Sequence, residues 1–383
     1  VSPSVKRMRG YTAAEAQAWR KDLWGAWVQG VKAAQEKPPK PEERPAPGEA
    51  RVRVGKDVMR FTVKSFGHKP KKGWPLYIYL HGGGPSKAGN DFAWGTAQGA
   101  QKVQNALYVC PRSPTDAWQD NWGEPMVYAL LDRLLLECYA LRDVDPNRVY
   151  LMGYSMGGWG AFHFAAALAD RWAAAGASAG GAYPGRSPPC NLRNTPLIVQ
   201  IGTADEGAGS HAKSKAYAEA VQVLRQSDPG GYVLEFREHK GAGHMINDSD
   251  TPAWMARFVR DPLPRKLAWQ QRIGHHGHME DRSEVFMPYA KRFSWLLVEN
   301  PGDGQKVAAE REGDTIRLSW EGPDRVTLLL DDRMLDLDQP IRVLRGEQEL
   351  FHGKVPRTLK AMVATLEDRG DPELVCAAEL TVP

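Results

Sequence analysis

The fold of this chain is decided by the stretch Asn147-Arg-Val-Tyr-Leu-Met-Gly-Tyr-Ser-Met-Gly-Gly158. Residues 149–152 are an apolar run of the kind that forms a strand buried on both faces of a parallel sheet. Gly153-Tyr-Ser-Met-Gly157 follows at once and has the pattern G-x-S-x-G, which places a serine on a sharp turn between a strand and a helix. Residues 159–168 are rich in alanine and aromatic residues and predict that helix. The stretch therefore predicts a strand–turn–helix unit with Ser155 presented on the turn.

A glycine-rich loop, an aspartate and a histidine lie at the ends of other strand-like runs. His81-Gly-Gly-Gly84 follows an apolar run, Asp205 ends the strand-like segment 196–205, and His244 follows the run 232–237. Because the carboxyl ends of parallel strands meet at one edge of a sheet, we expect these residues to converge on the serine turn. The chain order serine, aspartate, histidine is that of α/β-hydrolases and differs from the orders in chymotrypsin and subtilisin.

These residue types in this order predict acyl transfer by an activated serine. A serine hydroxyl at its ordinary pKa is a poor nucleophile and needs a base within hydrogen-bond reach. We expect His244 to be the base for Ser155, and Asp205 to hold the imidazole in the required tautomer. A developing oxyanion needs backbone N–H donors beside the serine. The expected donors are Met156 and either Gly83 or Gly84.

Two of these assignments have alternatives in the sequence. Glu206 and Asp248 are the other acidic residues near enough in sequence to serve as the partner of His244, and the strand-end position favours Asp205. His244 itself has the alternative of an ordinary loop histidine. The glycines Gly241 and Gly243 beside it favour a loop that approaches other backbone closely, and so the catalytic interpretation.

The substrate pocket is predicted from aromatic residues after the strands. The residues expected to bind substrate are His81, Tyr154, Trp94, Trp118 and Trp122. The ring of His81 is expected to orient the glycine loop rather than to transfer a proton. For the tryptophans, packing in the core beneath long loops is an equally good interpretation.

The motifs resemble those of a known family. The chain is similar to serine esterases of the α/β-hydrolase superfamily, in the group with polyhydroxybutyrate-depolymerase-like and feruloyl-esterase-like proteins, to which prolyl-oligopeptidase-type hydrolases are related. The residues that carry the resemblance are His81–Gly84, Asp145–Arg148, Gly153–Gly158, Gly202–Asp205 and Gly243-His244. The resemblance covers about residues 50–262 and implies hydrolysis of a carboxylic ester without a cofactor.

The alternation of strands and helices predicts an α/β fold with a mostly parallel sheet. Residues 51–65 are expected to form one edge strand, and the pattern after about residue 295 predicts a smaller antiparallel β domain, sandwich-like, with one helix. The capping box Thr12-Ala-Ala-Glu15 begins a helix, which either caps the site or packs on the surface. The expected divisions are an N-terminal helix and proline-rich linker (1–48), the hydrolase domain (49–262), a connecting segment (263–298) and the C-terminal β domain (299–383).

Composition limits the partners. The balance of 50 basic and 46 acidic residues gives a net charge of +4, too small and too scattered to predict nucleic-acid binding. No run of 18 apolar residues predicts a membrane span. The four cysteines, Cys110, Cys138, Cys190 and Cys376, have no CxxC pairing and are too few for a disulfide scaffold, and Cys110 and Cys138 are expected to be buried free thiols. The first residue is Val1, and together with the resemblance this favours a secreted or periplasmic protein.

One histidine cluster has two interpretations. His275, His276 and His278 match the spacing of no closed zinc site, so a solvated loop is favoured over a metal site, and no metal or other cofactor is expected.

Two other functions remain open. A prolyl-oligopeptidase-type peptidase is disfavoured because no propeller repeats precede the hydrolase motifs. A binding protein on a hydrolase scaffold is disfavoured because every member of the serine–histidine–aspartate set is present. The β domain is a candidate for binding a polysaccharide or for self-association, since fold alone does not set function.

Overall fold

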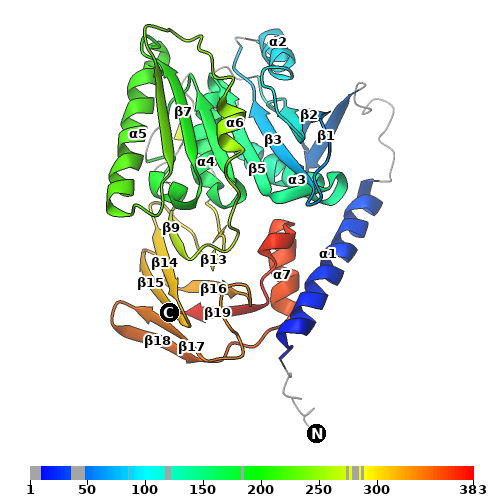
Figure 1. Ribbon diagram of the computed structural model, residues 1–383, viewed down its shortest axis with the longest axis vertical. Coiled ribbons are helices and arrows are strands. Elements are labelled where there is room, and N and C mark those ends of the chain that lie inside the picture. The colour runs from blue at the N-terminus through cyan, green and yellow to red at the C-terminus, as the bar shows by residue number, and fades with distance from the viewer. Residues whose placement is uncertain are drawn as a thin grey trace.

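The computed structural model describes residues 10–35, 48–84, 86–116, 122–182, 185–272, 276–277, 284–285 and 289–383. Figure 1 shows an upper part built around one large sheet, and a lower part formed by the C-terminal strands and helix α7. The helices are α1 (Ala13–Gln35), α2 (Lys87–Ala97), α3 (Pro125–Arg142), α4 (Met156–Ala167), α5 (Ser210–Ser227), α6 (Thr251–Met255) and α7 (Leu359–Arg369).

The large sheet has eight strands and confirms the expected α/β-hydrolase-like fold. Its spatial order is β1-β2-β4-β3-β5-β6-β7-β8; β2 is antiparallel to both β1 and β4, and the other neighbouring pairs of these described strands are parallel. The strands are β1 (Glu49–Val54), β2 (Asp57–Phe66), β3 (Trp74–Leu80), β4 (Ala106–Pro111), β5 (Val144–Tyr154), β6 (Ala174–Ser178), β7 (Leu197–Gly202) and β8 (Leu234–His239).

The single edge strand expected over residues 51–65 is wrong, because β1 and β2 form a hairpin there. The two strands pair antiparallel, with Val54 opposite Asp57. Gly55 lies between them at φ +57°, a left-handed conformation that glycine adopts without steric cost. The turn at Gly55 therefore folds the alternating segment back on itself.

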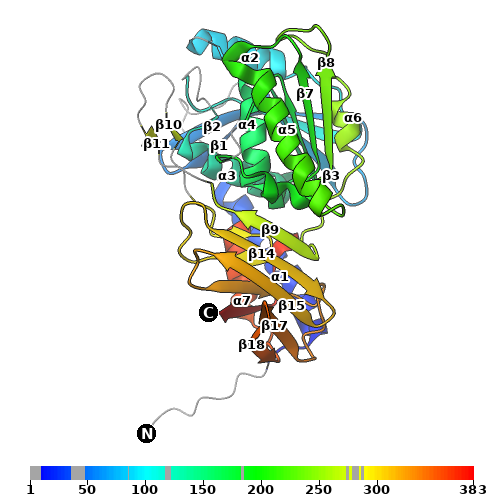
Figure 2. The same ribbon diagram turned by 90° about the vertical axis from the view of Figure 1, so that its left-hand side faces the viewer.

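Helices cover both faces of the sheet, and the alternation of side chains along β3 shows why. Leu76, Ile78 and Leu80 point into a core shared with α3, α4 and α5. Tyr77 and Tyr79 point the other way, into a core shared with α2 and α6. Figure 2 shows α4 and α5 together on one face of the sheet. A strand buried on both faces has no polar alternation, as the run in β5 predicted.

The C-terminal part consists of two further sheets. One has four strands in the order β12-β13-β16-β19, and the other has five in the order β18-β17-β15-β14-β9. The pairs are antiparallel except β15 and β17, which are parallel. Their strands are β9 (Lys266–Gln270), β12 (Arg292–Phe293), β13 (Leu296–Leu297), β14 (Lys306–Glu312), β15 (Thr315–Glu321), β16 (Val326–Leu330), β17 (Ile341–Arg345), β18 (Gln348–Gly353) and β19 (Ala378–Val382). A separate two-stranded pair is formed by β10 (His276–Gly277) and β11 (Glu284–Val285).

The stretch 263–298, expected to be a connecting segment, supplies strands to both C-terminal sheets. β9 pairs along β14, and β13 pairs with β16. Trp295 is fully buried and donates its indole N–H to Pro264 O at 2.9 Å. The same apolar core continues from the eight-stranded sheet into these strands. The two parts of the molecule are therefore packed together rather than joined by a free linker.

Helix α1 lies beside α3 and α7, away from the carboxyl ends of the eight-stranded sheet (Figure 1). Its capping box is formed, with Glu15 N donating to Thr12 Oγ1 at 3.2 Å and Thr12 N donating to Glu15 Oε2 at 2.7 Å. Ala16 is buried against the C-terminal residues Met362 and Leu366. Helix α1 therefore packs on the surface of the molecule and does not cover the serine turn. Of the helices that the structure describes, none has the length and apolar character needed to cross a membrane.

Candidate active site

The serine turn has the geometry that the motif predicts. Ser155 follows β5 directly and precedes α4, and its backbone has φ +59° and ψ −121°. A positive φ is uncommon and strained for a residue with a side chain, and such strain persists where the surrounding structure enforces it. Here the Ser155 N–H is fixed by a 2.9 Å bond to Ser178 O at the end of β6. Ser155 occupies the N-cap of α4 but its hydroxyl caps no backbone group, which leaves Oγ for other partners.

His244 and Asp205 complete a chain of contacts with Ser155. His244 Nε2 lies 2.8 Å from Ser155 Oγ, and His244 Nδ1 lies 2.9 Å from Asp205 Oδ2. Asp205 is buried, whereas the His244 side chain is about half exposed. The carboxylate thus holds a proton on Nδ1, so that Nε2 accepts from the serine hydroxyl. The structure brings together the three residues that the sequence selected.

The other acids considered for this position lie elsewhere. Glu206 is exposed directly before the short 3₁₀ helix Gly207–Gly209. Asp248 accepts a 2.8 Å bond from Gln101 Nε2 and also bonds with Ser178. Burial raises the pKa of the Asp248 carboxyl above its ordinary value. Asp205 alone of these acids has a bond to His244 among the described residues.

The loop after β3 places backbone beside the serine, and its donors are not equivalent. The Gly84 N–H donates to Asn90 Oδ1 at 2.9 Å, so it is already used. For the N–H groups of Gly83 and Met156 the described part of the chain shows no acceptor. Met156 is the first residue of α4, where the helix dipole favours negative charge. Of the donors expected from the sequence, Met156 and Gly83 are therefore the available pair.

Asn90 also supports this region, although no sequence motif indicates it. It is fully buried on α2, and its amide also approaches Asp116 O at 3.4 Å. A buried amide is costly unless it is hydrogen-bonded, so its contact with Gly84 fixes the glycine loop to α2. The signal available in the sequence was a lone asparagine on an otherwise small and apolar helix face, which is too weak to assign a partner.

His81 orients the glycine loop, as expected. Its Nε2 accepts the Ser113 N–H at 3.0 Å, and its Nδ1 lies 2.6 Å from Gly82 O. These partners require a proton on Nδ1 and none on Nε2. Burial lowers the pKa of His81 to about 4, so the ring is neutral at neutral pH. The imidazole is fully buried, so the contact with substrate that the sequence predicted for His81 is not formed by this ring.

The tryptophans expected to line a pocket are core residues where the structure describes them. Trp94 is buried and donates its indole N–H to Cys110 O at 2.9 Å. Trp122 is buried and donates to His81 O at 2.9 Å, beneath the glycine loop. Trp118 lies outside the described residues. The core-packing interpretation therefore holds for Trp94 and Trp122, since the sequence does not reveal which way a loop side chain points.

Tyr154 lies beside the histidine rather than at the mouth of a pocket. Its hydroxyl donates to His244 O at 2.7 Å and accepts from Ile246 N at 2.8 Å. Its ring also meets the imidazole edge-on, with centroids 5.9 Å apart.

No group of three or more histidine, cysteine or acidic side chains in the described residues is arranged to hold a metal ion. His275 and His278 lie outside those residues, as does the side chain of His276. The four cysteines are free thiols, three of them buried.

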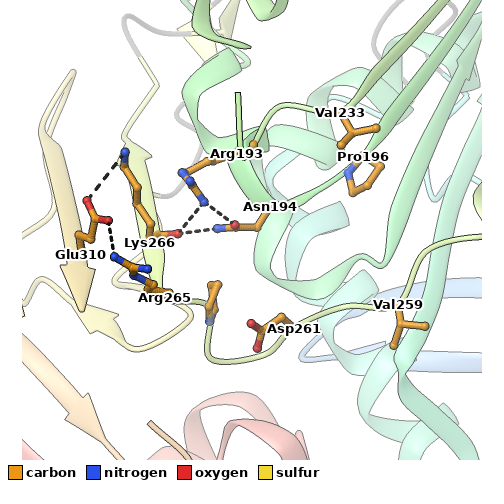
Figure 3. Close-up of a pocket in the computed structure, with 12 residues that line it drawn as sticks. Arg193, Asn194, Pro196, Val233, Val259, Asp261, Arg265, Lys266 and Glu310 are labelled. Carbon is orange, nitrogen blue, oxygen red and sulfur yellow. Dashed lines mark hydrogen bonds and ion pairs between the residues drawn. The ribbon is translucent and has the colours of Figure 1, made fainter. Parts of the chain in front are cut away.

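Figure 3 shows a cavity of about 450 Å³ near the amino ends of two strands of the eight-stranded sheet. Arg193, Pro196 and Val233 on its wall precede the amino ends of β7 and β8. Its cationic groups are engaged, because Arg193 binds Asp228 at 2.8 Å and Lys266 binds the same carboxylate at 3.0 Å. Because Ser155 follows the carboxyl end of β5, the cavity and the serine turn lie at opposite ends of the strands.

Known proteins are similar to part of this chain. No protein-family model matches it. A Schizosaccharomyces pombe protein, described as AB hydrolase superfamily protein C1039.03, is 26% identical over 193 residues, which are 48% of this chain and 47% of that protein. The chain thus spans about half the length of this curated relative.

Two solved structures illustrate the structural similarity. A thermostable esterase is 17% identical with a TM-score of 0.45, over 55% of this chain and 62% of that one. An S-formylglutathione hydrolase from Agrobacterium tumefaciens is 18% identical with a TM-score of 0.39, over 56% of this chain and 98% of that one. Its strand arrangement gives the chain an α/β-hydrolase-like fold, and about half of its length is similar in sequence to the Schizosaccharomyces pombe protein.

Proposed function

We propose that this protein is a serine hydrolase that cleaves carboxylic esters through an acyl-serine intermediate. The observation that carries the proposal is the pair of contacts that joins Ser155 Oγ to His244 Nε2 at 2.8 Å and His244 Nδ1 to Asp205 Oδ2 at 2.9 Å. The strained backbone of Ser155 adds support, because strain of this kind collects at functional sites.

The first half of the reaction forms the acyl-enzyme. Ser155 Oγ attacks the ester carbonyl carbon while its proton passes to His244 Nε2. The carbonyl oxygen becomes an oxyanion held by the N–H groups of Met156 and Gly83, and removing one donor of this type costs about 2.7–4 kcal/mol. The intermediate then expels the alcohol, which takes the proton from His244. Asp205 stabilises the imidazolium that exists between these proton transfers.

The second half releases the acid. A water molecule loses a proton to His244 Nε2 as its oxygen attacks the acyl carbon. The second oxyanion collapses, the bond to Ser155 Oγ breaks, and the serine regains its proton from His244. The half-exposed imidazole is accessible to that water. No cofactor takes part in any step.

The class of ester is proposed from the resemblance of the motifs. His81–Gly84 and Gly153–Gly158 are similar to the corresponding segments of esterases that act on aryl, feruloyl-type or polyester-type substrates. We therefore propose an ester with an aromatic or polymeric component as the natural substrate.

Turnover of p-nitrophenyl esters from acetate to decanoate tests the proposal, beside a p-nitroanilide that reports amide cleavage. Ser155→Ala should lower ester turnover by at least about 10⁴-fold, because the nucleophile is lost while binding remains. Ser227→Ala is the matched control, since Ser227 is an exposed serine at the end of α5 that bonds Leu224 O. Full ester turnover by Ser155→Ala, or cleavage of the anilide alone, contradicts the proposal.

A further inference from the structure

The loop that carries His244 is held to the rest of the molecule on both sides of the histidine. On the upstream side it is tied to the residues just before Asp205. The Gly241 N–H donates to Thr203 Oγ1 at 2.8 Å, and Ala242 O accepts the Ala204 N–H at 2.9 Å. These bonds fix the start of the loop relative to the carboxylate.

On the downstream side the residues next to the histidine are held by Tyr154, and Asp248, further along the loop, bonds with Gln101 and Ser178. Tyr154 donates its hydroxyl proton to His244 O at 2.7 Å and accepts the Ile246 N–H at 2.8 Å. These are the hydrogen bonds that the structure shows for these two backbone groups in the described part of the loop. Met245, between them, is 80% exposed and gives the loop little packing. The backbone groups on the two sides of Met245 are therefore held by the Tyr154 hydroxyl.

Tyr154 also stands next to the nucleophile in sequence. It is the last residue of β5, and Ser155 follows it on the strained turn. The end of β5 thus carries both the serine and the Tyr154 hydroxyl, which is hydrogen-bonded to the backbone of His244. Loss or lengthening of the hydrogen bond from Tyr154 to His244 O is therefore expected to move the imidazole relative to Ser155 Oγ.

We infer that Tyr154 is a positioning residue, which sets His244 Nε2 against Ser155 Oγ by bridging the backbone on both sides of Met245. This inference rests on the proposed serine hydrolase function. It assigns Tyr154 a role different from the direct contact with substrate that the sequence predicted.

A tyrosine hydroxyl is suited to this bridge because it donates one hydrogen bond and accepts another. Burial raises the pKa of Tyr154 above its ordinary value, so the proton needed by His244 O is retained. Tyr154→Phe keeps the edge-on ring contact with the imidazole but removes both bonds. The variant therefore separates the bridge from the packing.

Tyr150→Phe is the matched control. Tyr150 lies on the same strand, is buried, and donates its hydroxyl to Phe258 O at 2.8 Å. It loses a comparable bond to a backbone carbonyl, but one that does not belong to the histidine loop. Both variants are compared with the wild type for kcat, KM, thermal unfolding and the rate at which a fluorophosphonate labels Ser155.

Tyr154→Phe should lower kcat and the labelling rate together by about ten- to a hundred-fold, since small misplacements of reacting groups cost that much. Its KM should stay close to that of the wild type, and Tyr150→Phe should keep the wild-type kcat. Unchanged kcat and labelling in Tyr154→Phe overturn the inference while the proposed function stands. Equal losses of kcat in both variants overturn it as well, because the effect then follows stability alone. A wild-type chain that is neither labelled nor active removes the proposed function, and the positioning role with it.

Discussion

His81 shows how a single buried side chain prepares the site without taking part in the reaction. Its imidazole bonds the Ser113 N–H and Gly82 O, and its pKa is lowered to about 4 by burial. The unfolded chain binds a proton at His81 with the ordinary pKa near 6.5, so it binds protons more readily than the folded chain. The stability that neutral His81 contributes is therefore complete above pH 6.5 and is lost as the pH falls towards 4.

This linkage predicts the response to acid. The free energy of unfolding of the wild type should fall between pH 7 and pH 4.5 by up to about 3 kcal/mol more than that of His81→Gln, which cannot be protonated. Urea unfolding of both proteins across that range measures the difference. Parallel curves for the two proteins contradict the neutral, buried state of His81.

At the residue scale, the sequence predicted which residues contact Ser155 better than it predicted the residues that pack around them. Ser155, Asp205 and His244 each follow a strand of the sheet. The carboxyl ends of these strands lie at one edge of the sheet whatever the conformation of the loops. Trp94 and Trp122 also follow strands, but their rings turn into the core. The engagement of Gly84 by Asn90 depends on how α2 docks, which no local pattern contains.

At the scale of elements, the approach of α4 to β3 depends on Gly157. A Cβ at this position would lie 1.9 Å from Leu80 O and 2.8 Å from His81 O, both at the end of β3. Those neighbours are backbone atoms and cannot rotate away. Gly157 therefore lets the helix that begins at Met156 lie directly against the strand that leads into the glycine loop.

Gly157→Ala should destabilise the protein by about 1–3 kcal/mol, the usual cost of overpacking, and should lower turnover because the Met156 N–H moves with α4. Urea unfolding and p-nitrophenyl ester turnover measure the two effects. Gly95→Ala is the control, because Gly95 lies within α2 with no atom within 4 Å of the added Cβ. It should stabilise the protein by about 0.5–1 kcal/mol. Wild-type stability and turnover in Gly157→Ala would contradict this close packing of α4 against β3.

Elements with strong local signals were predicted well, and those defined by turns were not. The capping box of α1 and the alternating run that became β15 have clear patterns. The β1–β2 hairpin was taken as one strand because both halves alternate and Gly55 is a slight interruption. The parallel pairing of β15 with β17 joins strands that are distant in sequence, which periodicity does not encode.

For the molecule as a whole, a buried ionic network joins the eight-stranded sheet to the C-terminal sheets. Asp371, fully buried in the C-terminal part, accepts from Arg260 Nη1 at 2.8 Å, and the two residues are 111 positions apart. Asp170 accepts the Ser294 N–H at 2.8 Å and pairs with Arg369 at 3.1 Å. Composition and local patterns give no sign of such distant pairs. The role of the C-terminal part in binding polysaccharide or in self-association stays a prediction.

Removing one partner of a buried pair leaves a charge without compensation. Asp371→Ala should therefore lower the free energy of unfolding by about 3–5 kcal/mol. Glu321→Ala breaks the exposed pair with Lys306, whose atoms lie 3.0 Å apart, and should change stability by only about 0–1 kcal/mol. Denaturant unfolding of both variants compares the costs. Equal small effects contradict the view that this network fixes the two parts together.

Locating a fluorophosphonate adduct by mass spectrometry tests directly whether Ser155 is the nucleophile. An activated serine attacks such a reagent and keeps the phosphonyl group, so the adduct identifies the nucleophile. One adduct per chain is expected, on Ser155, and none in Ser155→Ala. An unlabelled wild-type chain, or an adduct on a different residue with Ser155→Ala still active on esters, contradicts this expectation.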